Sequence, residues 1–131
     1  MTSPFDVVTF SHGPAMKNRF MLAPLTNEQS HADGTLSDEE YRWLTYRAEG
    51  GFGLTMTCAS HVQRVGQAFT GQLGCYSDDH LPGLTRLAAG IKEHGSLAII
   101  SSTTEDVGPT PSSSAPSRCH RARTLMLVLV R

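Results

Sequence analysis

Cysteine and histidine are the side chains in this sequence best able to ligate a metal or carry redox chemistry. The three cysteines, Cys58, Cys75 and Cys119, are odd in number and widely spaced, so they match neither a disulfide framework nor a paired zinc motif. We therefore predict reduced thiols. The histidines fall in predicted turns, loops or helix ends without ligand-like spacing, which predicts exposed side chains and no metal site. The five of the six histidines to which this applies are His12, His31, His61, His80 and His94.

The bulk composition is that of an ordinary soluble protein. The chain has 131 residues, of which 39% are hydrophobic, and a net charge of -1, which leaves room for one small domain. The longest apolar run, residues 125–130, is far shorter than the roughly 20 residues that span a membrane. The N-terminus lacks a basic start followed by an apolar stretch. We therefore expect a cytoplasmic protein that binds neither nucleic acid nor a membrane.

The first elements able to position functional side chains are a hairpin and a strand near the N-terminus. Residues 7–10 alternate β-branched and aromatic types, and residues 11–14 carry turn-forming residues. A short apolar run over residues 20–23 then stops at Pro24. These signals predict a hairpin that leads directly into a buried strand.

The next predicted element is an amphipathic helix over residues 38–49. Ser37 and Glu40 have the spacing of a capping box, in which two side chains satisfy the free amides at a helix start. A Gly-Gly pair at residues 50–51 provides the stop. The residues predicted to face inward are Tyr41, Leu44, Thr45 and Ala48.

Two further strands and a second helix complete the regular part of the chain. Residues 53–59 lack strong alternation, which is typical of a strand covered on both faces. A second helix is predicted after them, capped by Ser77 or Asp78 with Pro82 in its first turn, and residues 97–100 form a third strand. The β-α-β-α-β order predicts a parallel α/β fold, either a doubly wound sheet or part of a (β/α)8 barrel. The apolar face of this helix is Leu84, Leu87, Ala88 and Ile91.

Four segments carry a pattern that chooses between these folds. They are NRFMLAPLT at 18–26, DG at 33–34 leading to Ser37 and Tyr41, RAEGG at 47–51, and GQLG at 71–74 before SDDH at 77–80. In this order and spacing they resemble the old yellow enzyme family of FMN-dependent NAD(P)H oxidoreductases. The resemblance spans residues 4–100 and implies the N-terminal hairpin and first three βα units of a (β/α)8 TIM barrel.

The resemblance also implies FMN as cofactor, NAD(P)H as co-substrate and a small-molecule substrate. FMN lies at the C-terminal ends of the strands in such a barrel, so the backbone of Ala23, Pro24 and Leu25 would lie against the flavin. The Thr26 hydroxyl would hydrogen-bond near flavin N5 and O4, the region whose electron density changes on reduction. Ala59 matches a small residue on which the flavin packs. The alternative for Thr26 is that it is a strand-end threonine that caps its own backbone. The alternative for Ala59 is that it is simply a small core residue.

The regular pattern changes after Ile100. The family continues there with a flavin-contacting glutamine, whereas residues 101–107 read SSTTEDV. If Ser101 is encoded by AGC or AGT, one cytosine restored before its codon produces that glutamine, and suitable codons then continue the family sequence. We therefore predict that residues 1–100 are a partial FMN-binding domain and that residues 101–131 are an irregular, disordered tail read out of frame. Resequencing that finds no single-base change restoring the frame would contradict this prediction.

Two functions of different classes follow. A (β/α)8 barrel usually takes roughly 250 residues, and its phosphate site comes from late strands. No catalytic residue can therefore be assigned here, and FMN binding by this chain is expected to be weak or absent. The first function is a truncated FMN-dependent NAD(P)H oxidoreductase, whose family transfers hydride through FMN to activated alkenes or similar acceptors. The second is a non-catalytic fragment, inert or self-associating through exposed sheet edges.

Overall fold

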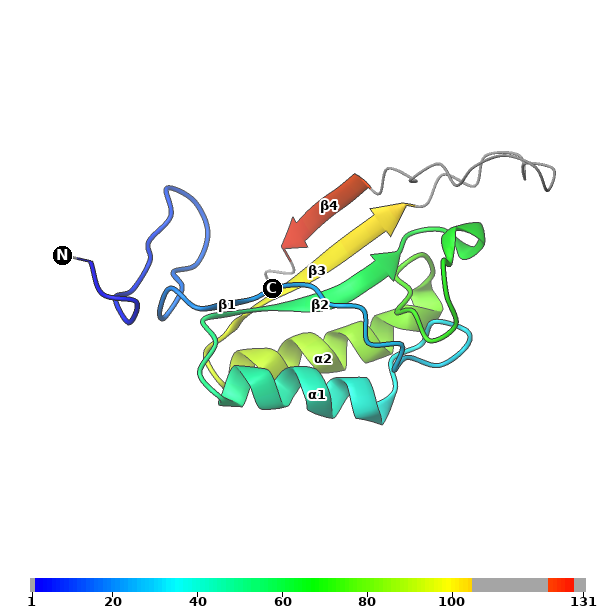
Figure 1. Cartoon of the computed structure of the whole chain (residues 1–131), viewed down its shortest axis with the longest axis horizontal. Coiled ribbons are helices and arrows are strands. Elements are labelled where there is room, and N and C mark those ends of the chain that lie inside the picture. Colours follow the sequence, from blue (N-terminus) through cyan, green and yellow to red (C-terminus); the bar gives the residue numbers. More distant parts are fainter. Residues whose placement is uncertain (1, 105–122, 129–131) are drawn as a thin grey trace, which may run out of the picture.

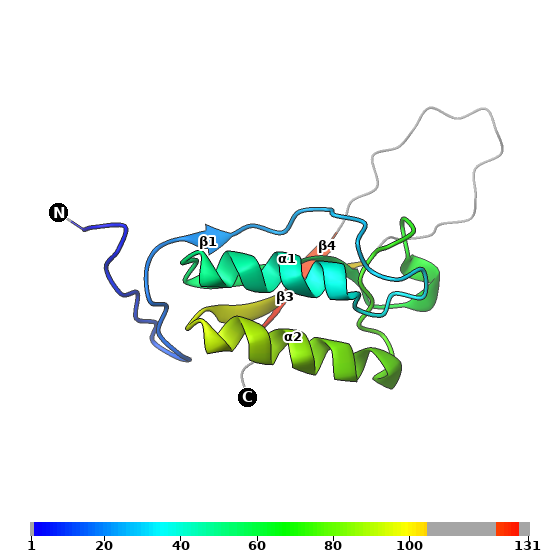
Figure 2. The ribbon, with the colours of Figure 1, turned by 90° about the horizontal axis from the view of Figure 1, so that it is seen from below.

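The computed structural model describes residues 2–104 and 123–128. These residues form an α/β fold with one sheet, whose strands lie in the order β1, β2, β3, β4. The strands are β1 (Met21–Leu22), β2 (Leu54–His61), β3 (Leu97–Thr104) and β4 (Arg123–Val128); the helices are α1 (Asp38–Glu49) and α2 (Leu81–Glu93), with 3₁₀ turns η1 (Arg64–Gly66) and η2 (Asp78–His80). Strands β1, β2 and β3 are parallel. Both helices cover the same face of the sheet (Figures 1 and 2).

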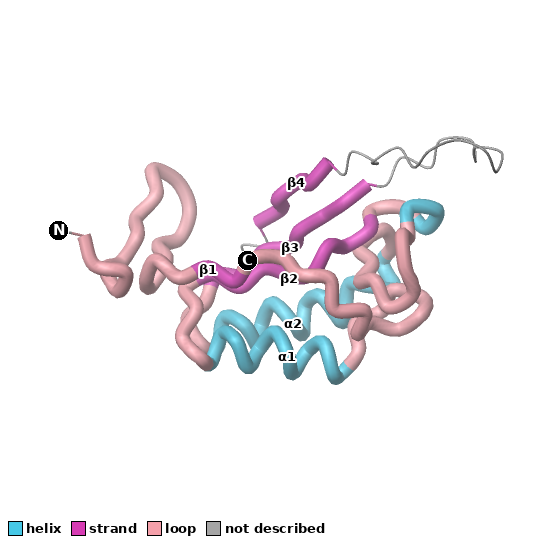
Figure 3. The backbone as a smooth tube through the Cα atoms, viewed as in Figure 1, coloured by secondary structure: helices cyan, strands magenta, loops and turns pink. Residues whose placement is uncertain are grey.

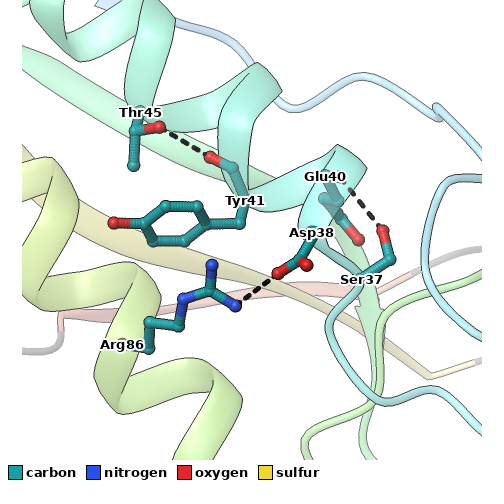
Figure 4. Close-up of polar contacts among 6 residues, drawn as sticks. All are labelled: Ser37, Asp38, Glu40, Tyr41, Thr45 and Arg86. Carbon is teal, nitrogen blue, oxygen red and sulfur yellow. Dashed lines mark hydrogen bonds and ion pairs between the residues drawn. The ribbon is translucent and has the colours of Figure 1, made fainter.

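Helix α1 has the bounds that the sequence predicts. Ser37 Oγ accepts a hydrogen bond from the Glu40 amide at 3.1 Å, as Figure 4 shows. At the other end, the Gly50 amide donates to the Tyr46 carbonyl at 2.9 Å. The Glu40 side chain does not complete the capping box and instead contacts Ser30.

Helix α2 begins later than predicted. Ser77 and Asp78 lead into η2, and the Ser77 hydroxyl bonds the Asp79 carboxylate at 3.4 Å instead of capping a helix. Pro82 lies in the first turn of α2, as expected. The prediction that Ser77 or Asp78 caps this helix is therefore wrong, because a 3₁₀ turn separates them from its start.

The helices and the sheet enclose an apolar core. Its buried residues come from α1, α2 and β3 and are Leu44, Ala48, Leu87, Ile91 and Ala98. The two helices approach closely at Gly90, where an added Cβ would lie 2.6 Å from the Tyr41 hydroxyl. At the helix surface, Arg86 lies over the Tyr41 ring and pairs with Asp38 at 2.6 Å (Figure 4). The predicted inward faces of both helices are thus confirmed at the core positions.

The N-terminal segment packs on strand residues away from this core. Met16 is buried with Leu54, Met56 and Ile99. The predicted hairpin is reduced to a single antiparallel bridge between Val8 and Met16. Residues 7–10 are therefore not a strand, because only one pair of residues meets across the turn.

The region after Ile100 is more regular than the sequence indicates. Strand β3 continues to Thr104, and β4 pairs with it in antiparallel register, with Ile100 opposite Leu127. The prediction of a disordered tail is wrong for these stretches, because the open edge of β3 offers unpaired backbone groups to a β-prone segment. Residues 105–122 and 129–131 lie outside the described residues, and the out-of-frame reading stays a prediction. Among the described helices, none is long and apolar enough to cross a membrane.

Candidate functional site

Strand β1 pairs with the first two residues of β2, Met21 with Leu54 and Leu22 with Thr55, and the chain after β1 runs on toward the C-terminal end of β2 (Figure 3). We call residues 23–26 and 58–61 the strand-end edge. In parallel α/β folds, ligands bind at this edge because the strand ends and the following loops converge there. The five residues that the resemblance assigns to flavin all belong to it.

The segment that follows β1 presents its surface to solvent. Ala23, Pro24, Leu25 and Thr26 are all exposed, and Leu25 has 56% of its surface accessible. The Thr26 hydroxyl makes no hydrogen bond to another described residue. The alternative in which this threonine caps its own backbone is thus not seen, and the hydroxyl is free to bond a ligand.

Ala59 lies beside a distortion in β2. Met56 is paired with Ile99 and Ala59 with Ser101, so β2 carries one more residue than β3 between these points. Ser101 N donates to Thr57 Oγ1 at 3.0 Å within this bulge. Bulges re-aim side chains near functional sites. Here the bulge leaves Ala59 half-buried rather than enclosed in the core.

The thiols near this edge are poor nucleophiles. Cys58 is free and buried. Burial, reinforced by the Glu40 carboxyl, raises the pKa of Cys58 to about 12. Burial also raises the pKa of Cys75. Both thiols stay protonated at neutral pH, as expected for small apolar groups, and Cys119 lies outside the described residues.

A buried glutamine, which sequence reasoning used only as part of a motif, ties the loops to this edge. Gln72 is 2% exposed. Its Nε2 donates to the Ala59 carbonyl at 3.1 Å and to Thr103 Oγ1 at 3.4 Å, and its Oε1 accepts from the Ala68 amide at 2.8 Å. The amide therefore links the ends of β2 and β3 to the loop between β2 and α2.

Two histidines behave differently from the prediction. His61 and His80 are 1% and 4% exposed, because the loop after β2 folds back and packs both rings around Tyr76. The prediction of exposed histidines is wrong for these two. His61 Nδ1 lies 3.0 Å from the Gln63 carbonyl, so Nδ1 carries the proton and Nε2 is left without a partner. Burial lowers the pKa of His80, and the neighbouring His61 lowers it further.

The other predicted histidine positions differ in exposure. His12 and His31 are exposed and His94 is half-buried. Among the residues that the structure describes, no group of three or more histidine, cysteine or acidic side chains could hold a metal ion.

The strand-end edge offers exposed backbone, apolar surface and one free hydroxyl. This set suits a flat ring that packs on backbone and accepts or donates hydrogen bonds at its rim.

Comparisons with known proteins identify the family to which the chain belongs. A family model described as the NADH:flavin oxidoreductase / NADH oxidase family matches residues 4–106. A probable NADH-dependent flavin oxidoreductase, YqiG, of Bacillus subtilis (strain 168) is 34% identical over 96 residues, which cover 73% of this chain and 26% of that protein. NADH:acrylate oxidoreductase of Vibrio harveyi is 35% identical over 100 residues, covering 76% and 10% respectively. The chain thus spans about a quarter or less of these relatives.

Solved structures show the same fold. A 2-naphthoyl-CoA reductase bound to 2-naphthoyl-CoA superposes with a TM-score of 0.74 and 27% identity, over 78% of this chain and 16% of that one. Old Yellow Enzyme from Pichia sp. AKU4542 superposes with a TM-score of 0.72 and 18% identity, over 78% and 26%. At 18% identity, the similarity to the Pichia protein is evidence for the fold alone.

Proposed function

Because the chain belongs to the NADH:flavin oxidoreductase / NADH oxidase family, we propose that its strand-end edge supplies the ring-facing part of an FMN site. The observation that carries this proposal is the exposed segment 23–26, whose threonine hydroxyl is free. The hydroxyl is exposed in the loop after β1, and ligands of parallel folds bind outside the C-terminal ends of the strands.

Each residue has a separate role in this proposal. The backbone of Ala23, Pro24 and Leu25 forms a surface for one side of the ring system, and half-buried Ala59 is small enough to let the ring approach β2. Thr26 Oγ1 hydrogen-bonds the rim of the ring. Bound FMN would supply hydride transfer from NAD(P)H to an acceptor. None of these residues supplies a proton or a nucleophile.

The whole enzyme's reaction is proposed from the family. We propose an FMN-dependent NAD(P)H oxidoreductase of old yellow enzyme type that reduces an activated alkene or a similar acceptor. The name of the Vibrio harveyi relative supports this class, because acrylate is an activated alkene. In this proposal the described residues supply the ring-facing part of the site, and no group is assigned to the FMN phosphate.

Flavin titration tests the role of Thr26. We expect weak, saturable quenching of riboflavin fluorescence by the full chain. Thr26→Val should weaken it about fivefold, the effect of one hydrogen bond. Thr9→Val is the matched control, because Thr9 is exposed in the N-terminal segment, outside the strand-end edge. Equal affinities for wild type and Thr26→Val would refute the assignment of Thr26.

The second candidate function is a non-catalytic fragment that associates through its sheet. It is favoured by β1, which is paired over only two residues and flanked by exposed apolar side chains. Phe20, Met21 and Leu25 are 42%, 51% and 56% exposed. Such an edge attracts another strand. Light scattering coupled to size exclusion distinguishes the two: a monomer that quenches riboflavin favours the flavin site, and oligomers that do not quench it favour the fragment.

A further inference from the structure

A fully buried carboxyl lies directly behind the strand-end edge. Glu40, in the first turn of α1, is 0% exposed, whereas its neighbours Asp38 and Glu39 face solvent. Figure 4 shows its side chain leaving the first turn beside Ser37. The helix cap needs only the Glu40 backbone amide. The buried carboxyl therefore requires a separate explanation.

The carboxyl contacts the segment that carries Thr26. Glu40 Oε2 is hydrogen-bonded to Ser30 Oγ, and Ser30 is itself buried. The Asn27 amide and the Cys58 thiol also lie close enough to act on its pKa. Three segments thus meet at this one side chain: α1, the loop after β1, and the end of β2.

The same loop is held from its other side by the turn before Leu73. The Ser30 amide donates to the Gly71 carbonyl at 3.0 Å. Gly71 has a φ of 81°, and an added Cβ there would lie 2.4 Å from the Glu28 carbonyl oxygen. Residues 27–30 are therefore clamped between Gly71 and Glu40, immediately after the exposed Thr26.

The chemistry of the carboxyl suits this position. Burial raises the pKa of Glu40. Hydrogen bonds with the side chains of Ser30, Asn27 and Cys58 act in the opposite direction and lower this pKa. None of these groups is cationic, so ionisation of Glu40 would leave a buried charge without an opposite charge among them. The titratable group that faces it from β2 is Cys58, whose pKa of about 12 keeps it neutral. A neutral acid can donate one hydrogen bond and accept others.

We propose that Glu40 is a positioning residue that holds the loop after β1, and with it Thr26, against the end of β2. The importance of this placement for flavin rests on the proposed function, but the clamp itself belongs to the chain. A test of the clamp therefore needs no flavin.

Hydrogen exchange of the full chain, read as protection factors for residues 26–30, tests the proposal. Glu40→Ala should lower these protection factors at least about fivefold, the effect of losing one buried hydrogen bond. Glu40→Gln should retain them, because the amide has the same shape and keeps an oxygen that accepts the Ser30 hydroxyl hydrogen bond. Raising the pH through the pKa of Glu40 should lower protection in the wild type and leave Glu40→Gln unchanged.

Two further variants keep the test decisive. Ser30→Ala removes the partner without touching α1 and should lower the same protection factors, even if Glu40→Ala does not fold. Glu49→Gln, on the exposed end of the same helix, should leave them unchanged. The proposal fails if Ser30→Ala and Glu40→Ala leave the loop protected, or if α2 loses protection equally, which indicates general destabilisation. Riboflavin binding can be lost or kept independently of either result.

Discussion

The helix-covered face of the sheet and the strand-end edge are built by different rules. On the covered face, Leu44, Leu87 and Ile91 are at most 2% exposed and contact other apolar side chains. Next to the strand-end edge, the buried Gln72 donates to the Ala59 carbonyl and the buried Glu40 is hydrogen-bonded to Ser30. The first region owes its stability to apolar burial and the second owes its shape to a few polar contacts. Substitutions should therefore cost more stability on the covered face than at the strand-end edge and the loops that support it.

The largest effect is expected from the covered face. Leu44→Ala should lower the free energy of unfolding by about 2–5 kcal/mol, because a fully buried leucine leaves a cavity. Tyr46→Ala, on the same helix but 70% exposed, is the control and should change it by less than about 0.5 kcal/mol. Urea unfolding followed by circular dichroism measures both. Equal effects would mean that α1 does not pack as described.

A glycine at the edge should come next. Gly71→Ala places a Cβ against the Glu28 carbonyl and at positive φ, and should cost about 1–3 kcal/mol of stability. Gly51→Ala has a comparable φ of 110° but no neighbour within 4 Å, so the difference between the two variants isolates the clash. Thermal unfolding of both proteins measures it. If Gly51→Ala is the more damaging, the loop is not clamped at Gly71.

The cap of α1 joins the two regions and should have an intermediate effect. Ser37→Ala removes the acceptor for the Glu40 amide and should cost about 0.5–2 kcal/mol. Ser37→Asp keeps an acceptor and is the matched control. Urea unfolding measures both. The cap is unimportant if alanine and aspartate behave alike.

The smallest effect is a pH dependence of the edge. The pKa of His80 is lowered in the folded protein, so the unfolded chain binds the proton more readily. Stability from this group is present above a pH of about 6.5, the unfolded pKa, and is lost as the pH falls below it. The melting temperature of His80→Gln should change less between about pH 7 and pH 5 than that of the wild type. An unchanged slope in this variant would assign the pH dependence to other groups.

The covered face could be predicted from sequence because its signals are local. The bounds of α1 follow from the Ser37 cap, the glycine pair and the helical spacing of Leu44 and Ala48. The paired strands after Ile100 could not be predicted in this way, because periodicity within a segment does not reveal an open edge elsewhere.

The buried polar side chains next to the strand-end edge could not be predicted from sequence, for a related reason. Thr26 is exposed, and its assignment to the flavin stays a prediction. In contrast, the burial of His61, His80 and Glu40 depends on segments that meet only in three dimensions. Glu40 carried one sequence signal, the capping box, and that signal concealed its contact with Ser30. A cap residue whose side chain turns inward leaves no local pattern.

The central claim is that this chain holds the ring-facing part of an FMN site and not its phosphate. Parallel fluorescence titrations of the full chain with riboflavin and with FMN test it most directly. The two ligands share the ring and differ in the phosphate. We predict weak, saturable binding of both with affinities within about twofold, since charge-assisted phosphate contacts would add about 1.5–3 kcal/mol each. FMN binding that is tenfold or more tighter, or no saturable binding of either flavin, would contradict the account.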